Sequence, residues 1–280
     1  MSKPRQFIQC DVFTSQPTKG NALAVVLDGE GLTEDQMQAF AAWTNLAETT
    51  FLFPPTMSDA DYKVRIFTPS QEMPFAGHPT LGSCMSWLRS GGVPKSAGIV
   101  RQECAVGIIE IDVITDVPAF VAPPTKILQM ADDERSRITN QLQIPEELIC
   151  AAVQLDNGPV WQVLELSSAQ DVLNVDSAKV RWPEFQAIGL IGRQPDGAET
   201  DFEVRMLAPS SGMSEDPITG SLNAALACWL QTEGRLQPKT VISQGTNVNR
   251  SGRVFVRSDD TGKILIGGEV QFLIEGTVEL

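Results

Sequence analysis

Short apolar runs, and runs in which apolar and polar residues alternate, occupy most of the first half of the chain. Runs of this kind are typical of β-strands when turn residues bound them. They predict strands at residues 7–13, 22–27, 49–53, 62–67, 98–103 and 106–114.

Two helices are expected between these strands. Thr33 and Gln36 stand at the spacing of a capping box, which predicts a helix from there to about Trp43. After residues 77–79, apolar side chains recur at helical spacing and predict a second helix that ends near Gly91. The first half is therefore expected to mix strands and helices.

The same order of elements recurs in the second half. Residues 118–124 contain three prolines and are the best candidate for a linker. Beyond them the pattern predicts a helix from about Thr219, and strands at 160–166, 201–207, 241–244, 253–257 and 264–274.

Individual residues recur as well. An offset of 140 joins Arg65, Pro69, Ser70 and Met73 to Arg205, Pro209, Ser210 and Met213. An offset of 138 joins Pro79, Gly82, Ser83 and Leu88 to Pro217, Gly220, Ser221 and Leu226. The recurrence predicts a duplicated α+β unit with domains at residues 1–119 and 120–280. Two such units face to face would bring two helix N-termini, which attract anions, towards one cleft.

Composition narrows the function. The 280 residues carry 21 Lys and Arg against 35 Asp and Glu, a net charge of −14, so nucleic-acid binding is not expected. No apolar run is long enough to span a membrane, and the N-terminal residues lack the apolar core of a signal peptide. Dinucleotide, P-loop and α/β-hydrolase motifs are absent from the sequence. We therefore expect a cytoplasmic protein that needs no cofactor and binds neither nucleic acid nor membrane.

Histidine and cysteine usage adds two further limits. His78 is the single histidine, which excludes zinc sites with two or three histidine ligands. Cysteines stand at five scattered positions, without a C-x-x-C pair: Cys10, Cys84, Cys104, Cys150 and Cys228. An odd, unpaired set predicts free and mostly buried thiols in a reducing compartment.

Three segments carry residues suited to acid/base chemistry: residues 45–51, 72–80 and 214–221. With their order and separations, they resemble the PhzF family of phenazine-biosynthesis proteins, which shares the fold of diaminopimelate epimerase. The resemblance extends from about Asp11 to the last strands. It implies two pseudo-symmetric domains, each a mixed or antiparallel sheet wrapped around a central helix. It also allows the final strand to return to the first domain, and it implies a homodimer.

The resemblance also assigns the site. It implies that Glu48 is the catalytic acid/base and that His78 and Asp216 assist it. A base near neutral pH is needed to remove a proton from carbon, and burial raises the pKa of a carboxyl group towards that range. Substrate-binding residues are expected at Gly77, Gly220, Ser221 and Asn21. Backbone N–H groups of the glycine loops would stabilise the negative charge that develops. If one carboxyl group removes and returns the proton, the reaction is an isomerisation of a small carboxylate-bearing substrate.

Each residue also has a purely structural interpretation. Glu48 alone fits a solvent-exposed turn carboxylate, His78 a neighbour of a helix N-cap, and Asp216 a carboxylate that complements a helix dipole. Two other functions stay open. One is an amino-acid epimerase, which is disfavoured because Gly77 and Asp216 stand where the epimerases carry paired cysteines. The other is a non-catalytic protein that binds small anions on the same fold.

Overall fold

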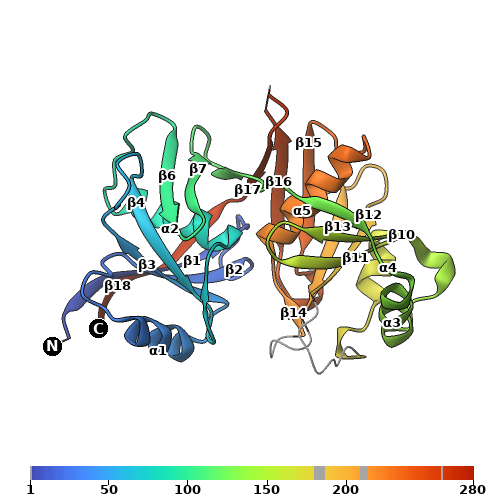
Figure 1. Cartoon of the computed structure of the whole chain (residues 1–280), viewed down its shortest axis with the longest axis horizontal. Helices are drawn as coiled ribbons and strands as arrows, with labels where there is room; N and C mark the ends of the chain where they lie inside the picture. The colour runs from blue at the N-terminus through green and yellow to red at the C-terminus, as the bar shows by residue number, and fades with distance from the viewer. Residues whose placement is uncertain (1, 180–186, 209–213, 260) are drawn as a thin grey trace. The chain divides into compact units, whose positions relative to one another are not determined.

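The computed structural model of the chain describes residues 2–179, 187–208, 214–259 and 261–280. The chain divides into two compact units. The first comprises Met1–Val121 and Gly267–Leu280, and the second comprises Ala122–Ile266. Figure 1 shows the colours of both chain ends in the first unit, where the red C-terminal strand runs beside the blue N-terminal strand.

A mixed sheet forms the frame of the first unit. Its strands follow the order β18, β1, β2, β3, β4, β6, β7, β8, with the short β5 beside the end of β4. The pairs β2–β3 and β4–β6 are parallel and the other pairs are antiparallel. The bounds are β1 (Pro4–Val12), β2 (Asn21–Val26), β3 (Glu48–Phe53), β4 (Tyr62–Phe67), β5 (Glu72–Met73), β6 (Ile99–Cys104), β7 (Gly107–Asp112), β8 (Ala119–Val121) and β18 (Val270–Glu279).

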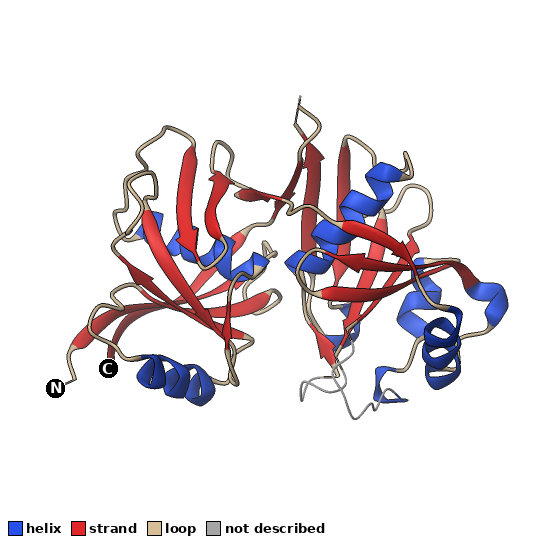
Figure 2. Cartoon of the chain, in the orientation of Figure 1, coloured by secondary structure: helices blue, strands red, loops and turns tan. Residues whose placement is uncertain are grey.

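Two helices cover opposite faces of this sheet. Helix α2 (Gly77–Arg89) packs against β1, β2 and β3, and Figure 2 shows the strands curving around it. Gly82 permits this close contact, because a Cβ atom there would lie 2.5 Å from Leu23 Cδ2 and 3.0 Å from Val12 Cγ2. Helix α1 (Glu34–Thr44) packs Met37 and Phe40 against β3 and β4 on the other face.

The second unit is built on a similar sheet. Its strands follow the order β9, β10, β11, β12, β13, β15, β16, with β14 beside β13. The strand bounds are β9 (Lys126–Gln129), β10 (Ile149–Asp156), β11 (Val160–Leu166), β12 (Ile188–Arg193), β13 (Phe202–Leu207), β14 (Glu215–Asp216), β15 (Lys239–Gln244), β16 (Gly252–Ser258) and β17 (Ile264–Gly267). The helices are α3 (Asp132–Leu142), α4 (Ala169–Asn174) and α5 (Gly220–Thr232).

The two sheets repeat each other strand by strand. Antiparallel and parallel pairs alternate in the same order from β1 to β7 and from β10 to β16. Each sheet also packs against a helix of 13 residues, α2 or α5. The fold is therefore α+β, as the sequence predicts.

One detail of the predicted recurrence is wrong. Strands β4 and β13 do match at an offset of 140, but α2 begins at Gly77 and α5 at Gly220, an offset of 143 rather than 138. The connection before the short strand is longer in the second unit, so Gly220 corresponds to Gly77 and not to Gly82. Pro209, Ser210 and Met213 of the predicted match lie outside the described residues.

Most of the predicted elements are present with small shifts at their ends. The capping box is formed, because Thr33 Oγ1 accepts from the Gln36 N–H and Gln36 Oε1 accepts from the Thr33 N–H. The single strand predicted at 264–274 is instead two strands, β17 and β18, separated by Gly268 and Glu269. A Cβ atom at Gly268 would lie 2.1 Å from Phe13 Cδ1, so the chain passes closely over that ring.

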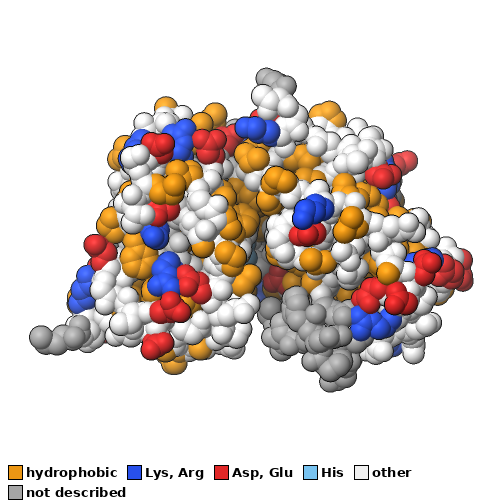
Figure 3. All heavy atoms as spheres, in the orientation of Figure 1, with side chains coloured by type: hydrophobic (Ala, Val, Ile, Leu, Met, Phe, Trp, Pro, Cys, Tyr) orange, Lys and Arg blue, Asp and Glu red, His pale blue; other side chains and the backbone are white. Residues whose placement is uncertain are grey.

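The surface carries charges of both signs. On the face that Figure 3 shows, acidic and basic side chains are interspersed with apolar ones. Within the described part of the chain, no helix is both long and apolar enough to span a membrane.

Candidate active site

Glu48 lies at the junction of α1 and β3. Asn45 ends the helix in the left-handed conformation, with φ of 53°, and so turns the chain towards the strand. Asparagine adopts this conformation more readily than most residues. Glu48 is the first residue of β3, beside Leu23 of β2. Its side chain is only 17% exposed, so it is not the solvent-exposed turn carboxylate that the sequence alone left open.

His78 reaches the same place from α2. It is the second residue of that helix, and its side chain is 6% exposed. Its Nε2 atom lies 3.0 Å from Glu48 Oε2. Two motifs separated by 30 residues therefore bring a carboxylate and an imidazole into contact.

Hydroxyl groups hold β3 and α2 in this register. Thr50 follows Glu48 on the same face of β3, because alternate residues of a strand share a face. Ser83 of α2 donates a hydrogen bond to Thr50 Oγ1 at 2.9 Å. On the opposite face, the hydroxyls of Thr44 and Thr49 lie 2.9 Å apart and tie β3 to the end of α1. Glu48 is thus fixed by contacts on both faces of its strand.

The first turn of α2 is not capped by a side chain. Ala76 is the N-cap residue, with extended backbone and no hydrogen-bonding side chain. The first intrahelical hydrogen bond runs from the Thr80 N–H to the Ala76 carbonyl. Gly77 opens the helix directly before His78. The N-terminal dipole of α2 therefore points a partial positive charge towards the region of Glu48 and His78.

Asp216 belongs to the second unit, where it ends β14 close to the start of α5. It is 8% exposed and accepts a hydrogen bond from the Thr219 hydroxyl at 2.5 Å. Gln244, at the end of β15, donates to Thr219 Oγ1 at 3.0 Å and to the Asp216 carbonyl at 3.3 Å. Thr219 lies within the motif at residues 214–221, so the sequence could point to it. Gln244 lies outside every motif, and the sequence predicted only a strand there.

The residue before Asp216 anchors the segment. Glu215 forms a bidentate ion pair with Arg205, with distances of 3.0 Å and 2.7 Å, and both side chains are 1% exposed. Arg205 also donates to the carbonyls of Val172 and Val175. The recurrence of Arg65 and Arg205 was the sequence signal for this pair, because Arg65 is bound by Glu72 in the same way in the first unit.

The remaining predicted residues have these positions. Asn21 is buried at the start of β2, in register with Val12 of β1. Gly77 is the first residue of α2. Gly220 and Ser221 are the first two residues of α5, and the Ser221 carbonyl accepts a hydrogen bond from Asn157 at 2.8 Å. The structure therefore joins Glu48 to His78 in one unit and Asp216 to the start of α5 in the other.

Two buried carboxylates with shifted pKa values, Glu203 and Glu103, lie elsewhere in the sheets. Burial raises the pKa of Glu203, although hydroxyl groups of Ser243 and Thr246 bind it and oppose that shift. Burial would also raise the pKa of Glu103, but hydrogen bonds from Thr56, Met57 and Lys63 lower it to about 2. In the ranges that the structure describes, histidine, cysteine and acidic side chains do not gather in threes that could hold a metal ion.

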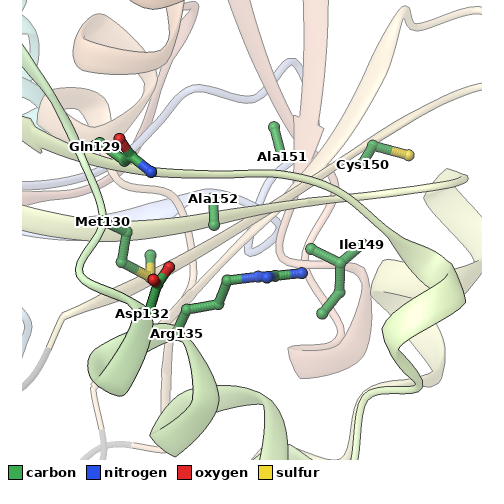
Figure 4. Close-up of a pocket in the computed structure, with 8 residues that line it drawn as sticks. All are labelled: Gln129, Met130, Asp132, Arg135, Ile149, Cys150, Ala151 and Ala152. Carbon is green, nitrogen blue, oxygen red and sulfur yellow. The ribbon is translucent and has the colours of Figure 1, made fainter.

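A pocket of about 220 Å³ lies in the second unit (Figure 4). It is bordered by the N-terminal turn of α3 and by one end of β10, and Figure 4 shows the Arg135 side chain extending across it. Its lining residues are Gln129, Met130, Asp132, Arg135, Ile149, Cys150, Ala151 and Ala152. Arg135 is already paired with Glu146, and the predicted site residues do not line the pocket. We therefore keep the candidate active site at the predicted residues and do not assign it to this pocket.

Comparisons with known proteins agree with the motifs. The family model for phenazine biosynthesis-like proteins, PhzC-PhzF, matches residues 10–276. Antisense-enhancing sequence 1 of Schizosaccharomyces pombe is 35% identical over 96% of this chain and 97% of its own length. Trans-2,3-dihydro-3-hydroxyanthranilate isomerase of Pseudomonas aeruginosa is 29% identical over 95% of this chain and 94% of its own.

Solved structures share the fold. A PhzF-family phenazine biosynthesis protein of Bacillus anthracis superposes with a TM-score of 0.83, at 20% identity, over 99% of this chain and 100% of that one. The resemblance inferred from the three motifs is confirmed, and the predicted class of enzyme agrees with relatives that are named isomerases. This chain belongs to the PhzC-PhzF family of phenazine biosynthesis-like proteins.

Proposed function

We propose that this protein is a cofactor-independent isomerase that moves a proton on a small carboxylate-bearing substrate. The observation that carries the proposal is the 3.0 Å approach of Glu48 Oε2 to His78 Nε2 in a largely buried position. The isomerase names of full-length relatives support the reaction class. For the substrate class we take the compound in one relative's name, trans-2,3-dihydro-3-hydroxyanthranilate, which carries a carboxylate, an amine and a hydroxyl group.

In the proposed reaction, Glu48 acts first as a base and then as an acid. Its carboxylate removes a proton from carbon, and the C–H electron pair spreads into the adjoining unsaturated system. Glu48, now protonated, returns the proton to a different carbon, so the electrons and the proton balance without an oxidant or reductant. His78 holds the Glu48 carboxyl group in place during both steps. The positive end of α2, at Gly77, stabilises the negative charge of the intermediate.

Asp216 completes the proposal as a binding residue. Its carboxylate is suited to accept a hydrogen bond from the substrate's amine or hydroxyl group. Gly220 and Ser221, at the start of α5, offer backbone N–H groups to the substrate carboxylate. A hydrogen bond to a charged group contributes about 1.5–3 kcal/mol, so we expect Asp216→Asn to lower kcat/KM by about 10- to 100-fold.

The experiment follows the reaction in deuterated water by NMR, with trans-2,3-dihydro-3-hydroxyanthranilate as the probe. The wild-type protein is expected to isomerise it, and solvent deuterium enters the new C–H position to the extent that protonated Glu48 exchanges with water before it returns the proton. Glu48→Gln removes the proposed base and should slow turnover by at least about 10²- to 10⁴-fold. The control is Glu110→Gln, which alters a half-exposed carboxylate paired with Arg101 in the same unit.

Full activity in Glu48→Gln would show that the base lies elsewhere. A wild-type protein that leaves the probe unchanged would reject this substrate. A screen of smaller unsaturated acids and amino acids for deuterium uptake would then test the reaction class itself. The cytoplasmic location and the homodimer are further parts of the proposal, and light scattering on the purified protein measures the second.

A further inference from the structure

Two buried amide side chains lie beneath the start of α5. Gln244, at the end of β15, and Asn223, in the first turn of α5, both have no exposed surface. Gln244 Oε1 accepts hydrogen bonds from the Thr219 N–H at 3.1 Å and from Asn223 Nδ2 at 2.8 Å. Thr219 is the N-cap residue of α5, and its own side chain does not cap the helix. Gln244 instead accepts a hydrogen bond from the backbone N–H group of Thr219.

The hydrogen bonds around Gln244 run in one direction. Asn223 Nδ2 donates to Gln244 Oε1, and Gln244 Nε2 donates in turn to Thr219 Oγ1. Thr219 Oγ1 accepts the hydrogen bond from Gln244 Nε2. The Thr219 hydroxyl then donates its own proton to Asp216 Oδ2. Every donor in the series is used, and the last acceptor is the Asp216 carboxylate. The series therefore ends on a carboxylate oxygen, which accepts the Thr219 proton.

Close packing against two glycines also fixes the backbone of residues 217 and 218, which follow Asp216. Gly245 follows Gln244 with φ of +95°, and a Cβ atom there would lie 2.7 Å from the Pro217 carbonyl oxygen. A Cβ atom at Gly252 would lie 2.4 Å from Ile218 Cγ1. Residues 217 and 218 therefore rest directly on the end of β15 and the start of β16. Because interiors are close-packed, Asp216 has little freedom to move relative to Gln244.

In the first unit, other residues occupy the positions that correspond to Gln244 and Asp216. Strands β6 and β15 each have six residues, and Cys104 ends β6 where Gln244 ends β15. Strands β5 and β14 each have two residues, and Met73 ends β5 where Asp216 ends β14. In the first unit the buried amide stands two residues earlier on β6, at Gln102, where it bonds the Thr80 hydroxyl of α2, and no carboxylate stands at the end of β5. A purely structural cap would be equally useful in both halves.

We propose that Gln244 is a positioning residue for Asp216, and that it acts through the Thr219 hydroxyl. The inference rests on the proposed function, in which Asp216 binds the substrate. Gln244 itself does not touch the substrate in this arrangement. It fixes the rotamer of Thr219, and Thr219 fixes the direction of the Asp216 carboxylate.

The experiment compares four variants in the assay with trans-2,3-dihydro-3-hydroxyanthranilate. Gln244→Met and Thr219→Val each break the series while keeping side-chain size, and displacement of a binding group by about 1 Å lowers kcat/KM by about 100-fold. Thr219→Ser keeps the hydroxyl and should restore activity to near the wild-type value. The matched control is Ser243→Ala on the same strand, whose hydroxyl faces Glu203 on the opposite side of the sheet.

A mutant cycle separates positioning from simple loss of stability. If Gln244 acts through Asp216, adding Gln244→Met to Asp216→Asn should cost little further activity, whereas independent effects would multiply. Multiplying losses, or equal losses in Gln244→Met and Ser243→Ala, would overturn the inference. Full activity in Asp216→Asn would instead reject the role of Asp216 in the proposed function.

A crystal structure of each variant gives a readout that does not depend on the substrate. We expect the Asp216 carboxylate to change rotamer in Gln244→Met and in Thr219→Val, and to keep its rotamer in Ser243→Ala. An unchanged Asp216 side chain in Gln244→Met would overturn the inference even if the probe is not turned over.

Discussion

Carboxylate groups in this protein are held in four different ways. Glu48 faces an imidazole, Asp216 accepts from a hydroxyl, and Glu215 is bound in two places by a guanidinium group. Glu103 accepts backbone and hydroxyl hydrogen bonds from residues 56 and 57. The buried pair of Glu215 and Arg205 has every charge satisfied, so it is suited to structure. The partners described for Glu48 and Asp216 are an imidazole and a hydroxyl group, which suits the roles proposed for them.

The environment of Glu103 predicts a pH-dependent stability. Its pKa of about 2 in the folded protein lies below the ordinary value of 4.5. The stabilisation is therefore complete above pH 4.5 and is lost as the pH falls towards 2. We expect Glu103→Gln to destabilise the fold by about 1.5–3 kcal/mol at pH 7, because it removes hydrogen bonds to a charge.

Urea unfolding of wild type and Glu103→Gln at pH 7, 4 and 3 measures this effect. The difference in unfolding free energy should shrink as the pH falls. The control is Glu110→Gln, since that carboxylate is half exposed. A difference that stays constant from pH 7 to pH 3 would contradict the stated cause.

At this scale, the sequence predicts residues that stand in short motifs and misses those that act across the fold. Glu48, His78 and Asp216 each belong to a segment of fewer than ten residues with several chemically specific positions. Gln244 lies 28 residues after Asp216 and sits in an ordinary strand pattern. Its contact with Asp216 exists only because β15 pairs beside β13, which local sequence does not encode.

Among the elements, local signals predicted the helices α1, α2 and α5. The capping box at Thr33 predicted the start of α1, because its hydrogen bonds are made within four residues. The longer elements α3, β10 and β12 were missed, as were the two-residue strands β5 and β14 and the six-residue helix α4. Such short strands depend on pairing with a neighbour more than on their own pattern. The helix offset was misjudged because Gly82 and Gly220 share a residue type but not a position.

Gly82 gives a test of how α2 sits on its sheet. In Gly82→Val, the added atoms would overlap Leu23, Val12 and Cys10. We expect a loss of about 1–3 kcal/mol of stability, because overpacking forces buried side chains and backbone to shift. We also expect lower activity in the folded fraction, since α2 carries His78.

Thermal unfolding and the isomerase assay, carried out on the same preparation, measure both effects. The control is Met85→Val, which alters a half-buried position on the same helix. Wild-type stability in Gly82→Val would show that α2 can move away from β1 and β2 without cost.

For the molecule as a whole, the duplication is symmetric in fold and asymmetric in chemistry. Thr49 pairs with Phe67 as Ile188 pairs with Leu207, so the buried Ala187, just before β12, stands where Glu48 begins β3. Met73 stands where Asp216 does in the second unit. Each half thus carries one carboxylate at a position that its counterpart fills with an apolar side chain. This division fits one proton-transferring group and one binding group better than two equivalent bases.

Cysteine labelling reports on the two units separately. Cys10, Cys84 and Cys104 are buried in the first unit, and burial raises the pKa of each thiol, to about 12 for Cys10. In the second unit, Cys150 is exposed and Cys228 is half-buried. We expect a thiol reagent at pH 8 to modify Cys150 rapidly in the native protein and the three thiols of the first unit only upon unfolding.

Mass spectrometry of the protein labelled at increasing denaturant concentration reads this out. The thiols of the first unit should become modified together, over one transition. The Cys150→Ser variant should lose the rapid reaction and keep that transition. Rapid modification of Cys10 or Cys84 without denaturant would contradict the described packing.

The pairing of β18 with β1 along nine residues has a consequence for biosynthesis. The ribosome releases the last strand of the first unit only after the whole second unit has been made. Residues 122–266 can therefore fold first. The sheet of the first unit is completed only when β18 has been synthesised and pairs with β1. Truncation of the C-terminus, or fusion of another protein to it, would then impair the folding of the first unit. This unit contains Glu48, and most of it is translated first.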